Sequence, residues 1–121
     1  MTESSHLYPA PSPALSRRRT ALAPEPARAF TAFSKAVFAD GALPSKTKQL
    51  LAVAVAHVTQ CPYCIRGHTR AALNQGATDE EIMEAIWVAA EMRAGGAYAH
   101  SQLALDVMAD HEATPAPKHP V

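Results

Sequence analysis

The prolines of this chain confine long helices to its central part. Five of the ten prolines lie in residues 1–26 and three lie in residues 115–120. Proline lacks a backbone N–H and blocks the interior of a helix. We therefore expect residues 1–24 to form a flexible arm, residues 25–112 to form one helical domain, and residues 113–121 to form a flexible tail.

The composition favours helices over strands. The chain contains 26 alanines but only 5 glycines, 3 phenylalanines, 3 tyrosines and 1 tryptophan, and alanine loses the least free energy on entering a helix. Hydrophobic residues make up 48% of the sequence, which excludes a wholly disordered chain. We predict an all-α domain of about five helices.

Charge and hydropathy limit the partners and the location. Eleven basic and eleven acidic residues give a net charge of zero, so a strongly basic nucleic-acid-binding protein is not expected. No apolar run approaches the roughly 18 residues of a membrane span, and the first residues contain no apolar signal segment. We expect a cytoplasmic protein that binds neither nucleic acid nor a membrane.

The first two helices of the domain differ in their apolar patterns. Apolar residues at helical spacing indicate a helix over residues 26–39, and Pro44 fits the start of a second one. The run 50–56 in that second helix is apolar on every side, and a strand is the rival interpretation. A body of fewer than about 90 residues has a small core, so we expect neighbouring subunits to cover this helix, with Trp87 in the core or at an interface.

Three local signals delimit the later helices. Gly76 is expected to end the third helix as a left-handed cap. Thr78 and Glu81 have the spacing of a capping box, which opens the fourth helix. Gly95 and Gly96 are expected to separate the fourth helix from the fifth.

The only two cysteines, Cys61 and Cys64, stand three residues apart, and His68 follows. Pro62 suits the first position of a helix, which makes Cys61 its N-cap. At 100° per residue, the two cysteines and His68 share one helical face. A helix N-terminus stabilises a thiolate, and an imidazole one turn after Cys64 can exchange its proton. This spacing favours redox chemistry and a reversible disulfide between the two cysteines.

Three other interpretations of the cysteine pair stay open. A structural zinc site needs four ligands, and His57 or His100 would have to complete a set begun by the cysteines and His68. A purely structural disulfide does not suit a reducing cytoplasm. Two inert buried cysteines are the third alternative. We expect no metal and no cofactor.

Residues 40–101 resemble the core of the alkylhydroperoxidase D and carboxymuconolactone decarboxylase superfamily. The resemblance rests on C-x-x-C-x-x-x-H after an apolar helix, followed by G-A-T-x-E-E-I. It implies an alkylhydroperoxidase D-like all-α fold whose subunits assemble as trimers or as hexamers of two trimers. The true decarboxylase branch lacks the C-x-x-C motif, so lactone decarboxylation is not expected.

The resemblance also implies roles for three residues. Cys64 would be the peroxidatic cysteine that attacks a hydroperoxide, Cys61 would resolve the resulting sulfenic acid, and His68 would belong to the proton relay. The expected partners are a hydroperoxide substrate and a reductant, either a dithiol or a thioredoxin-like or lipoyl-bearing partner. The alternative function is a non-enzymatic, oligomeric redox sensor that uses the same dithiol.

The chain departs from the peroxidase pattern at two positions. A glutamate twelve residues before the first cysteine acts as the relay base in the peroxidases, and here that position is Gln49. Tyr63 replaces a histidine between the cysteines. An antiparallel pairing of the second and third helices would leave between Gln49 and His68 a gap that a side chain plus one water can bridge, yet an amide cannot hold a proton. We therefore expect the peroxidase activity to be weak.

Overall fold

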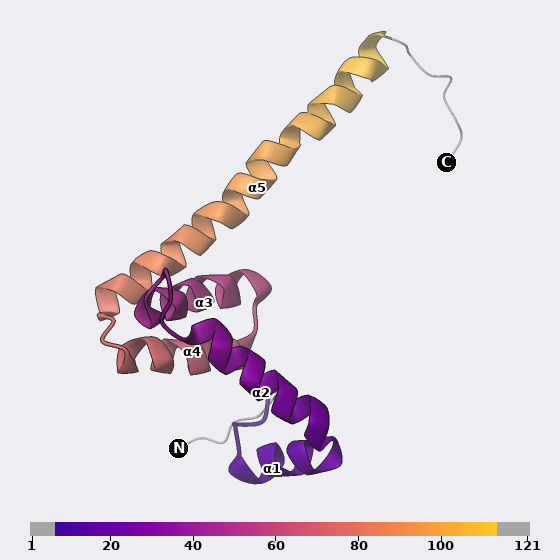
Figure 1. Cartoon of the computed structure of the whole chain (residues 1–121). Coiled ribbons are helices and arrows are strands. Elements are labelled where there is room, and N and C mark those ends of the chain that lie inside the picture. Colours follow the sequence, from indigo (N-terminus) through magenta and orange to yellow (C-terminus); the bar gives the residue numbers. More distant parts are fainter. Residues whose placement is uncertain (1–6, 114–121) are drawn as a thin grey trace.

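The computed structural model describes residues 7–113, and its regular structure in that range is entirely helical (Figure 1). This confirms the predicted all-α fold of about five helices. The five helices in chain order are α1 (Pro13–Leu22), α2 (Pro24–Phe38), α3 (Ser45–Thr59), α4 (Pro62–Asn74) and α5 (Asp79–Ala113). None of them is long and apolar enough to cross a membrane.

A hairpin of α3 and α4 is the centre of the fold, and the first part of α5 packs across α3 (Figure 1). The strand alternative for the apolar run in α3 is thereby excluded. Small side chains dominate the core, because helices that present alanine can approach closely. The buried apolar residues are Val53, Ala56, Ala72, Ala77, Ile82 and Ala89, with Leu50 and Ile86 packed against them.

The turn between α3 and α4 is built from local backbone chemistry. Gln60 closes α3 in the left-handed conformation, with φ of 58°. The backbone N–H of Cys61 then donates to the carbonyl of Ala56 at 3.2 Å. Pro62 starts α4 with Cys61 as its N-cap, as predicted. Only one residue therefore separates Gln60 from α4, and the two helices must pack as a hairpin.

The junction between α4 and α5 follows the predicted signals. Gly76 has φ of +90°, a conformation that costs a residue with a side chain more than it costs glycine. The N–H of Thr78 donates to the Glu81 carboxylate at 2.9 Å, and the N–H of Glu81 donates to the Thr78 hydroxyl at 3.1 Å. Glu81 also forms an ion pair with Lys46 of α3 at 2.9 Å. The capping box thus fixes both the start of α5 and its position against α3.

The prediction that Gly95 and Gly96 separate two helices was wrong. One helix of 35 residues, α5, runs through both glycines. Glycine disfavours a helix interior by roughly 1 kcal/mol relative to alanine, but it does not forbid helical backbone angles. Alanines on both sides of the pair offset this cost within a long helix.

The segment expected to be a flexible arm, residues 1–24, contains one helix. Residues 13–22 form α1, whose N-cap Ser12 accepts a hydrogen bond from the N–H of Leu15 at 3.2 Å. Pro13 and Pro24 occupy first-turn positions of α1 and α2, where a missing N–H costs nothing. The prolines therefore begin helices here instead of preventing them. The expected tail lies outside the described residues, apart from its first residue, which ends α5.

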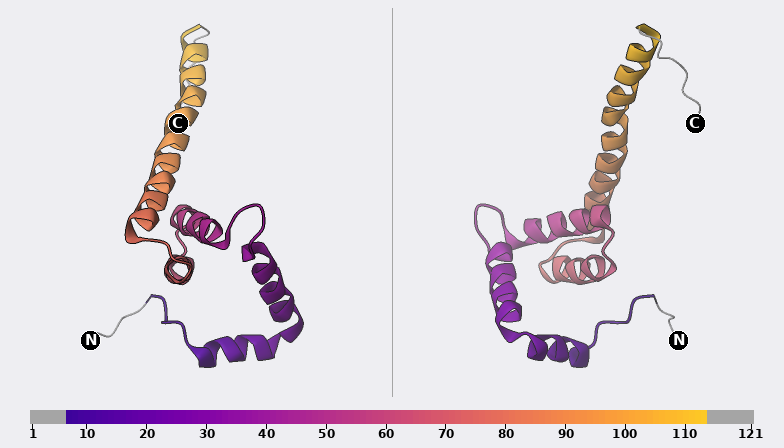
Figure 2. Two further views of the ribbon diagram at one scale, coloured as in Figure 1. Left: turned by 60° about the vertical axis from the view of Figure 1, so that its left-hand side comes forward. Right: turned by 90° about the vertical axis from the view of Figure 1, so that its right-hand side faces the viewer.

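The segment before α1 returns to the hairpin (Figure 2). The Tyr63 hydroxyl donates to the carbonyl of Pro9 at 2.8 Å, and the rings of Tyr8 and Tyr63 meet edge to face at 6.0 Å. The N-terminal segment is thus attached to α4 at the residue between the two cysteines. Neither α1 nor α2 contains a fully buried residue.

Candidate active site

The two cysteines lie together at the N-terminus of α4. Cys61 is the N-cap, and its sulfur accepts a hydrogen bond from the backbone N–H of Cys64 at 3.3 Å. The two Sγ atoms are 2.8 Å apart and share a hydrogen bond, with both cysteines free and half-buried. The helix start therefore holds the two sulfur atoms in contact, as disulfide formation requires.

This contact separates the acidities of the two thiols. The hydrogen bond with the Cys64 side chain lowers the pKa of Cys61, and the Cys64 backbone N–H lowers it further. The same bond to Cys61 raises the pKa of Cys64, with burial and repulsion from the Cys61 thiolate adding to the effect. Cys61 is thus the first of the pair to lose its proton, and its thiolate is held by the start of the helix.

His68 lies beside a buried amide from the neighbouring helix. Its Nδ1 donates to Oε1 of Gln49 at 2.8 Å, and Gln49 is only 9% exposed. The hairpin of α3 and α4 makes this contact directly, whereas the residue spacing along the two helices predicted a side chain plus a water between them. Because an amide oxygen only accepts, Nδ1 carries the proton of the neutral ring, and Nε2 is left as an acceptor.

A pocket of about 470 Å³ opens beside these residues. Helix α2 supplies one wall, where Phe38 stacks on the His68 ring with 5.1 Å between the ring centres. Cys64 lines the pocket and Cys61 does not. The complete lining is Ser34, Lys35, Phe38, Gln49, Tyr63, Cys64, Gly67, His68 and Ala71.

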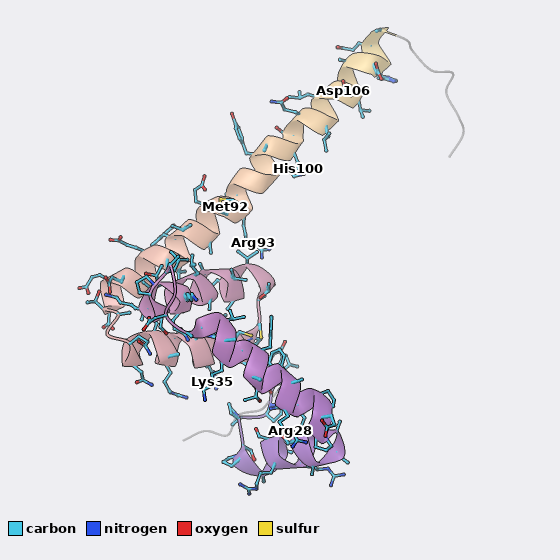
Figure 3. The ribbon with its side chains drawn as sticks, viewed as in Figure 1. Arg28, Lys35, Met92, Arg93, His100 and Asp106 are labelled. Atoms are coloured by element: carbon cyan, nitrogen blue, oxygen red, sulfur yellow. The ribbon has the colours of Figure 1, made fainter. Side chains whose placement is uncertain are left out.

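The sequence did not identify the contribution of α2 to this site. Phe38 belongs to the apolar pattern of its helix, and Lys35, which Figure 3 labels on α2, precedes it by three residues, close to one helical turn. The only available signal was that i, i+3 spacing, which is common to many helices. Their place in the pocket depends on how α2 returns across the hairpin, and this is a tertiary feature.

The other two histidines considered for the site lie elsewhere. His57 Nδ1 donates to the carbonyl of Val53 at 2.7 Å, and His100 Nδ1 donates to the carbonyl of Gly96 at 2.7 Å. Each ring satisfies a carbonyl four residues earlier in its own helix, and neither lines the cysteine pocket. Across residues 7–113, no three side chains of His, Cys, Asp or Glu are arranged to hold a metal ion.

Fold and site together define a small helical protein with a paired-cysteine site at the start of one helix of a hairpin. The chain belongs to the carboxymuconolactone decarboxylase family, whose sequence model matches residues 24–107. The superfamily resemblance inferred from the motifs is therefore confirmed.

Related proteins support this assignment. An uncharacterized protein in the cox locus of Paracoccus denitrificans is 71% identical over 80 residues, which are 66% of this chain and 72% of that protein. A crystal structure from Methanobacterium thermoautotrophicum has a TM-score of 0.66 and 36% identity, covering 70% of this chain and 96% of its own. The crystal structure of an apo carboxymuconolactone decarboxylase family protein from Legionella pneumophila has a TM-score of 0.60 and 38% identity. The match covers 65% of this chain and 70% of that protein.

Proposed function

We propose that this protein reduces hydroperoxides through its cysteine pair, with Cys64 as the peroxidatic residue and Cys61 as the resolving one. The observation that carries the proposal is the contact of the two sulfur atoms at 2.8 Å, beside a pocket that Cys64 and His68 both line. Redox-active dithiols at a helix start have this arrangement.

The proposed catalytic cycle has three steps. The Cys64 thiolate attacks the outer oxygen of the hydroperoxide, the O–O bond breaks, and the alkoxide takes a proton and leaves as an alcohol. Cys61 then attacks the Cys64 sulfenic acid, which releases water and forms the Cys61–Cys64 disulfide. An external dithiol reduces this disulfide by exchange and is itself oxidised to a disulfide.

The order of thiol acidities makes a proton acceptor necessary. Since the first proton is lost from Cys61, the thiol of Cys64 must lose its own proton before it attacks. Two acceptors are near: the Cys61 thiolate at 2.8 Å, and Nε2 of His68, one turn after Cys64 along the same pocket. Transfer to Cys61 leaves it as a thiol, and this thiol must lose the proton again before it attacks the Cys64 sulfenic acid.

Gln49 acts on this chemistry through His68. Its amide oxygen holds Nδ1 of the imidazole at 2.8 Å and so keeps Nε2 as an acceptor. A carboxylate at the same position would hold the ring in the same way and would also stabilise the imidazolium formed after proton transfer. The amide orients the base without this charge, and the expected consequence is slow turnover.

The first test of this function is consumption of an organic hydroperoxide with excess dithiothreitol. We expect turnover in the wild type and none above the uncatalysed rate in Cys64→Ser. His68→Ala should lower the rate near neutral pH by about 10²-fold, the lower end of general-base effects. The deficit should shrink only above the raised pKa of Cys64, where its thiolate forms without help. Equal rates in the wild type and Cys64→Ser would falsify the proposal.

A second candidate function is redox sensing, and the buried amide of Gln49 is the observation that favours it. A dithiol that oxidises once and is reduced slowly reports oxidant without clearing it. The discriminating measurement is the number of turnovers per subunit with reductant in excess. A single oxidation event followed by no further consumption indicates a sensor, whereas repeated cycles indicate an enzyme.

A further inference from the structure

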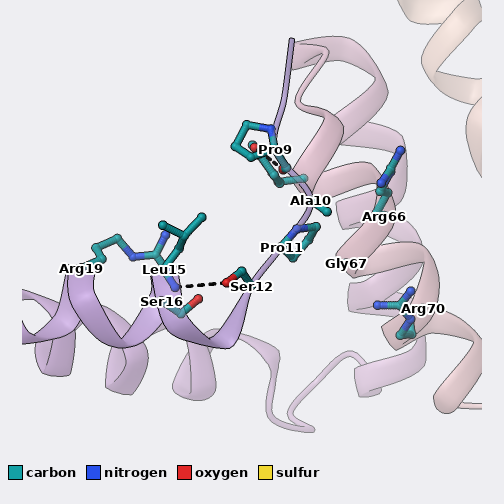
Figure 4. A pocket seen from close by; sticks show the side chains of 11 residues that line it. Pro9, Ala10, Pro11, Ser12, Leu15, Ser16, Arg19, Arg66, Gly67 and Arg70 are labelled. Carbon is teal, nitrogen blue, oxygen red and sulfur yellow. Dashed lines mark hydrogen bonds between the residues drawn. The ribbon is translucent and has the colours of Figure 1, made fainter. Parts of the chain in front are cut away.

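A second, larger pocket lies between the N-terminal segment and α4. Its volume is about 700 Å³, which is within the usual range for small-molecule sites. Figure 4 shows residues 9–12 and α1 on one side of it and α4 on the other. This pocket and the cysteine pocket are adjacent, because Tyr63 and Gly67 line both of them.

Every charged side chain that lines the larger pocket is an arginine. Arg19 comes from α1, whereas Arg66 and Arg70 stand one turn apart on α4 (Figure 4). Within residues 7–113, none of the three forms an ion pair. The chain as a whole has equal numbers of basic and acidic residues, so this local excess does not follow from the composition.

Such a group of cations is unfavourable without a counter-charge, since like charges around one cavity repel. Arginine binds carboxylates and phosphates through two parallel N–H donors, which suits recognition of a planar or tetrahedral anion. The cysteine pocket repeats the pattern, because its only cationic side chain is Lys35 and no acidic residue lines it. Neither cavity therefore has an acidic side chain in its lining that would repel an anion.

The remaining lining of the larger pocket is of two kinds. Pro9, Pro11 and Leu15 contribute apolar surface, and Ser12 and Ser16 contribute hydroxyl groups. An inorganic anion would leave the apolar surface uncovered. A molecule with an anionic head group and a short hydrocarbon part would cover both the cations and the apolar wall.

We infer that this pocket binds the anionic head group, carboxylate or phosphate, of a small amphipathic molecule. In the part that concerns catalysis, the inference rests on the function proposed above: the far end of the bound molecule would pass Tyr63 and Gly67 to reach Cys64. The substrate class would then be an organic hydroperoxide that carries a negative charge.

Binding can be tested without turnover. The probes are octanoate, octyl phosphate and neutral octanol, titrated calorimetrically into the wild type at low salt. We expect at least one of the anions to bind about tenfold more tightly than octanol, and the tighter anion identifies the head group. The double variant Arg66→Gln/Arg70→Gln should lose this preference. The matched control, Arg17→Gln/Arg18→Gln, removes the same charge from exposed positions of α1 outside the pocket and should keep it.

Equal binding of all three probes by the wild type, or an anion preference that survives in Arg66→Gln/Arg70→Gln, would overturn the inference. A parallel measurement compares a fatty-acid hydroperoxide with tert-butyl hydroperoxide as substrates. The Arg66→Gln/Arg70→Gln variant should raise KM for the charged substrate about tenfold and leave the neutral one unchanged. If neither hydroperoxide is consumed, the proposed function fails, and the calorimetric titration still decides whether the pocket binds anions.

Discussion

The two cysteines belong to one C-x-x-C motif at the same helix start, yet their pKa values are shifted in opposite directions. The cause is one hydrogen bond between their sulfur atoms, which lowers the pKa of Cys61 and raises the pKa of Cys64. Position in the helix strengthens the difference, since only Cys61 also accepts from a backbone N–H. The lowered pKa thus belongs to Cys61, whereas Cys64 is the cysteine that lines the pocket.

Alkylation of the reduced protein with iodoacetamide should follow this order of acidities. Because the thiolate reacts and the thiol does not, Cys61 should be modified at lower pH than Cys64. In Cys64→Ala the hydrogen bond is lost, so the pKa of Cys61 should rise toward the ordinary value of about 8.5. Mass spectrometry of the labelled peptide across pH 5–9 reports both profiles. Modification of Cys64 before Cys61 would contradict the assignment.

Substitutions of Gln49 should change turnover in both directions. Gln49→Glu keeps the hydrogen bond to His68 and adds a charge that stabilises the imidazolium, so hydroperoxide reduction should become faster, by about tenfold or more. Gln49→Leu leaves Nδ1 of His68 without its acceptor, so turnover should fall. Gln49→Leu should also lower the free energy of unfolding by about 1–3 kcal/mol, because the half-buried Nδ1–H donor of His68 is left unpaired.

The pH profile of kcat/KM distinguishes a relay role for Gln49 from a structural one. A changed relay shifts the alkaline or acidic limb of the profile, whereas a merely structural defect lowers the rate equally at every pH. Gln75→Leu is the matched control, since Gln75 is exposed, lies at the end of α4 and does not line the cysteine pocket. It should leave the shape of the profile unchanged.

At the scale of single elements, the junction between α4 and α5 is held by the capping box of Thr78 and Glu81 and by the ion pair of Glu81 with Lys46. Thr78→Ala removes the N-cap hydroxyl and should lower the free energy of unfolding by about 1 kcal/mol. Thr20→Ala on exposed α1 is the control and should change it by less than about 0.5 kcal/mol. Urea denaturation at neutral pH measures both. Equal stabilities of the two variants would show that the capping box contributes nothing.

The contribution of this junction to the free energy of unfolding should fall at acidic pH. The hydrogen bond from Lys46 is the main cause of the lowered pKa of Glu81, and the Thr78 N–H adds to it. The folded-state pKa therefore lies below the unfolded value of about 4.3. The stabilisation is fully present above that value and is lost as the pH falls through the lower, folded pKa. Glu81→Gln should accordingly flatten the acid limb of the curve of stability against pH.

The elements that the sequence predicted well are those set by local backbone chemistry. Pro62 after Cys61, the left-handed Gly76 and the pair Thr78 and Glu81 each act within one turn of the helix they delimit. The proximity of Gln49 to His68 could also be predicted, because the length of one hairpin fixes it. Phe38 could not, since the path of α2 across the hairpin depends on contacts that no local pattern encodes. The continuity of α5 was missed because a pair of glycines weakens a helix by only a small amount.

For the whole molecule, the exposure of the outer part of α5, residues 97–113, is the feature that the fold of a single chain does not explain. All residues from 97 to 113 are exposed, and this part of α5, which includes His100 and Asp106, extends away from the other helices (Figures 1–3). Trp87 is 68% exposed as well, so it does not belong to the core of one chain. The apolar run of α3 is only half covered, because Leu51 and Val55 point outward.

The arrangement of apolar residues on the outer part of α5 predicts that it is covered on two sides. At about 100° per residue, Leu103 and Val107 form one stripe, and Tyr98, Leu105 and Met108 form another on roughly the opposite side. A helix that is apolar on both sides is stable in water only between neighbours. We predict a homo-oligomer, a trimer or a hexamer, in which α5 from one subunit lies between others.

Light scattering of the wild type at micromolar concentration should give a mass of three or six subunits. Leu103→Asp/Val107→Asp should shift the protein toward a lower mass. Both positions are exposed within one chain, so the helical content by circular dichroism should change little. Gln102→Asp, compared with Leu103→Asp alone, is the control, because position 102 lies between the two apolar stripes on the side of Asp106. A wild type that stays monomeric would contradict the prediction, as would an oligomer that survives charges in the apolar stripe, because α5 would then have to be covered by something other than a second copy of the chain.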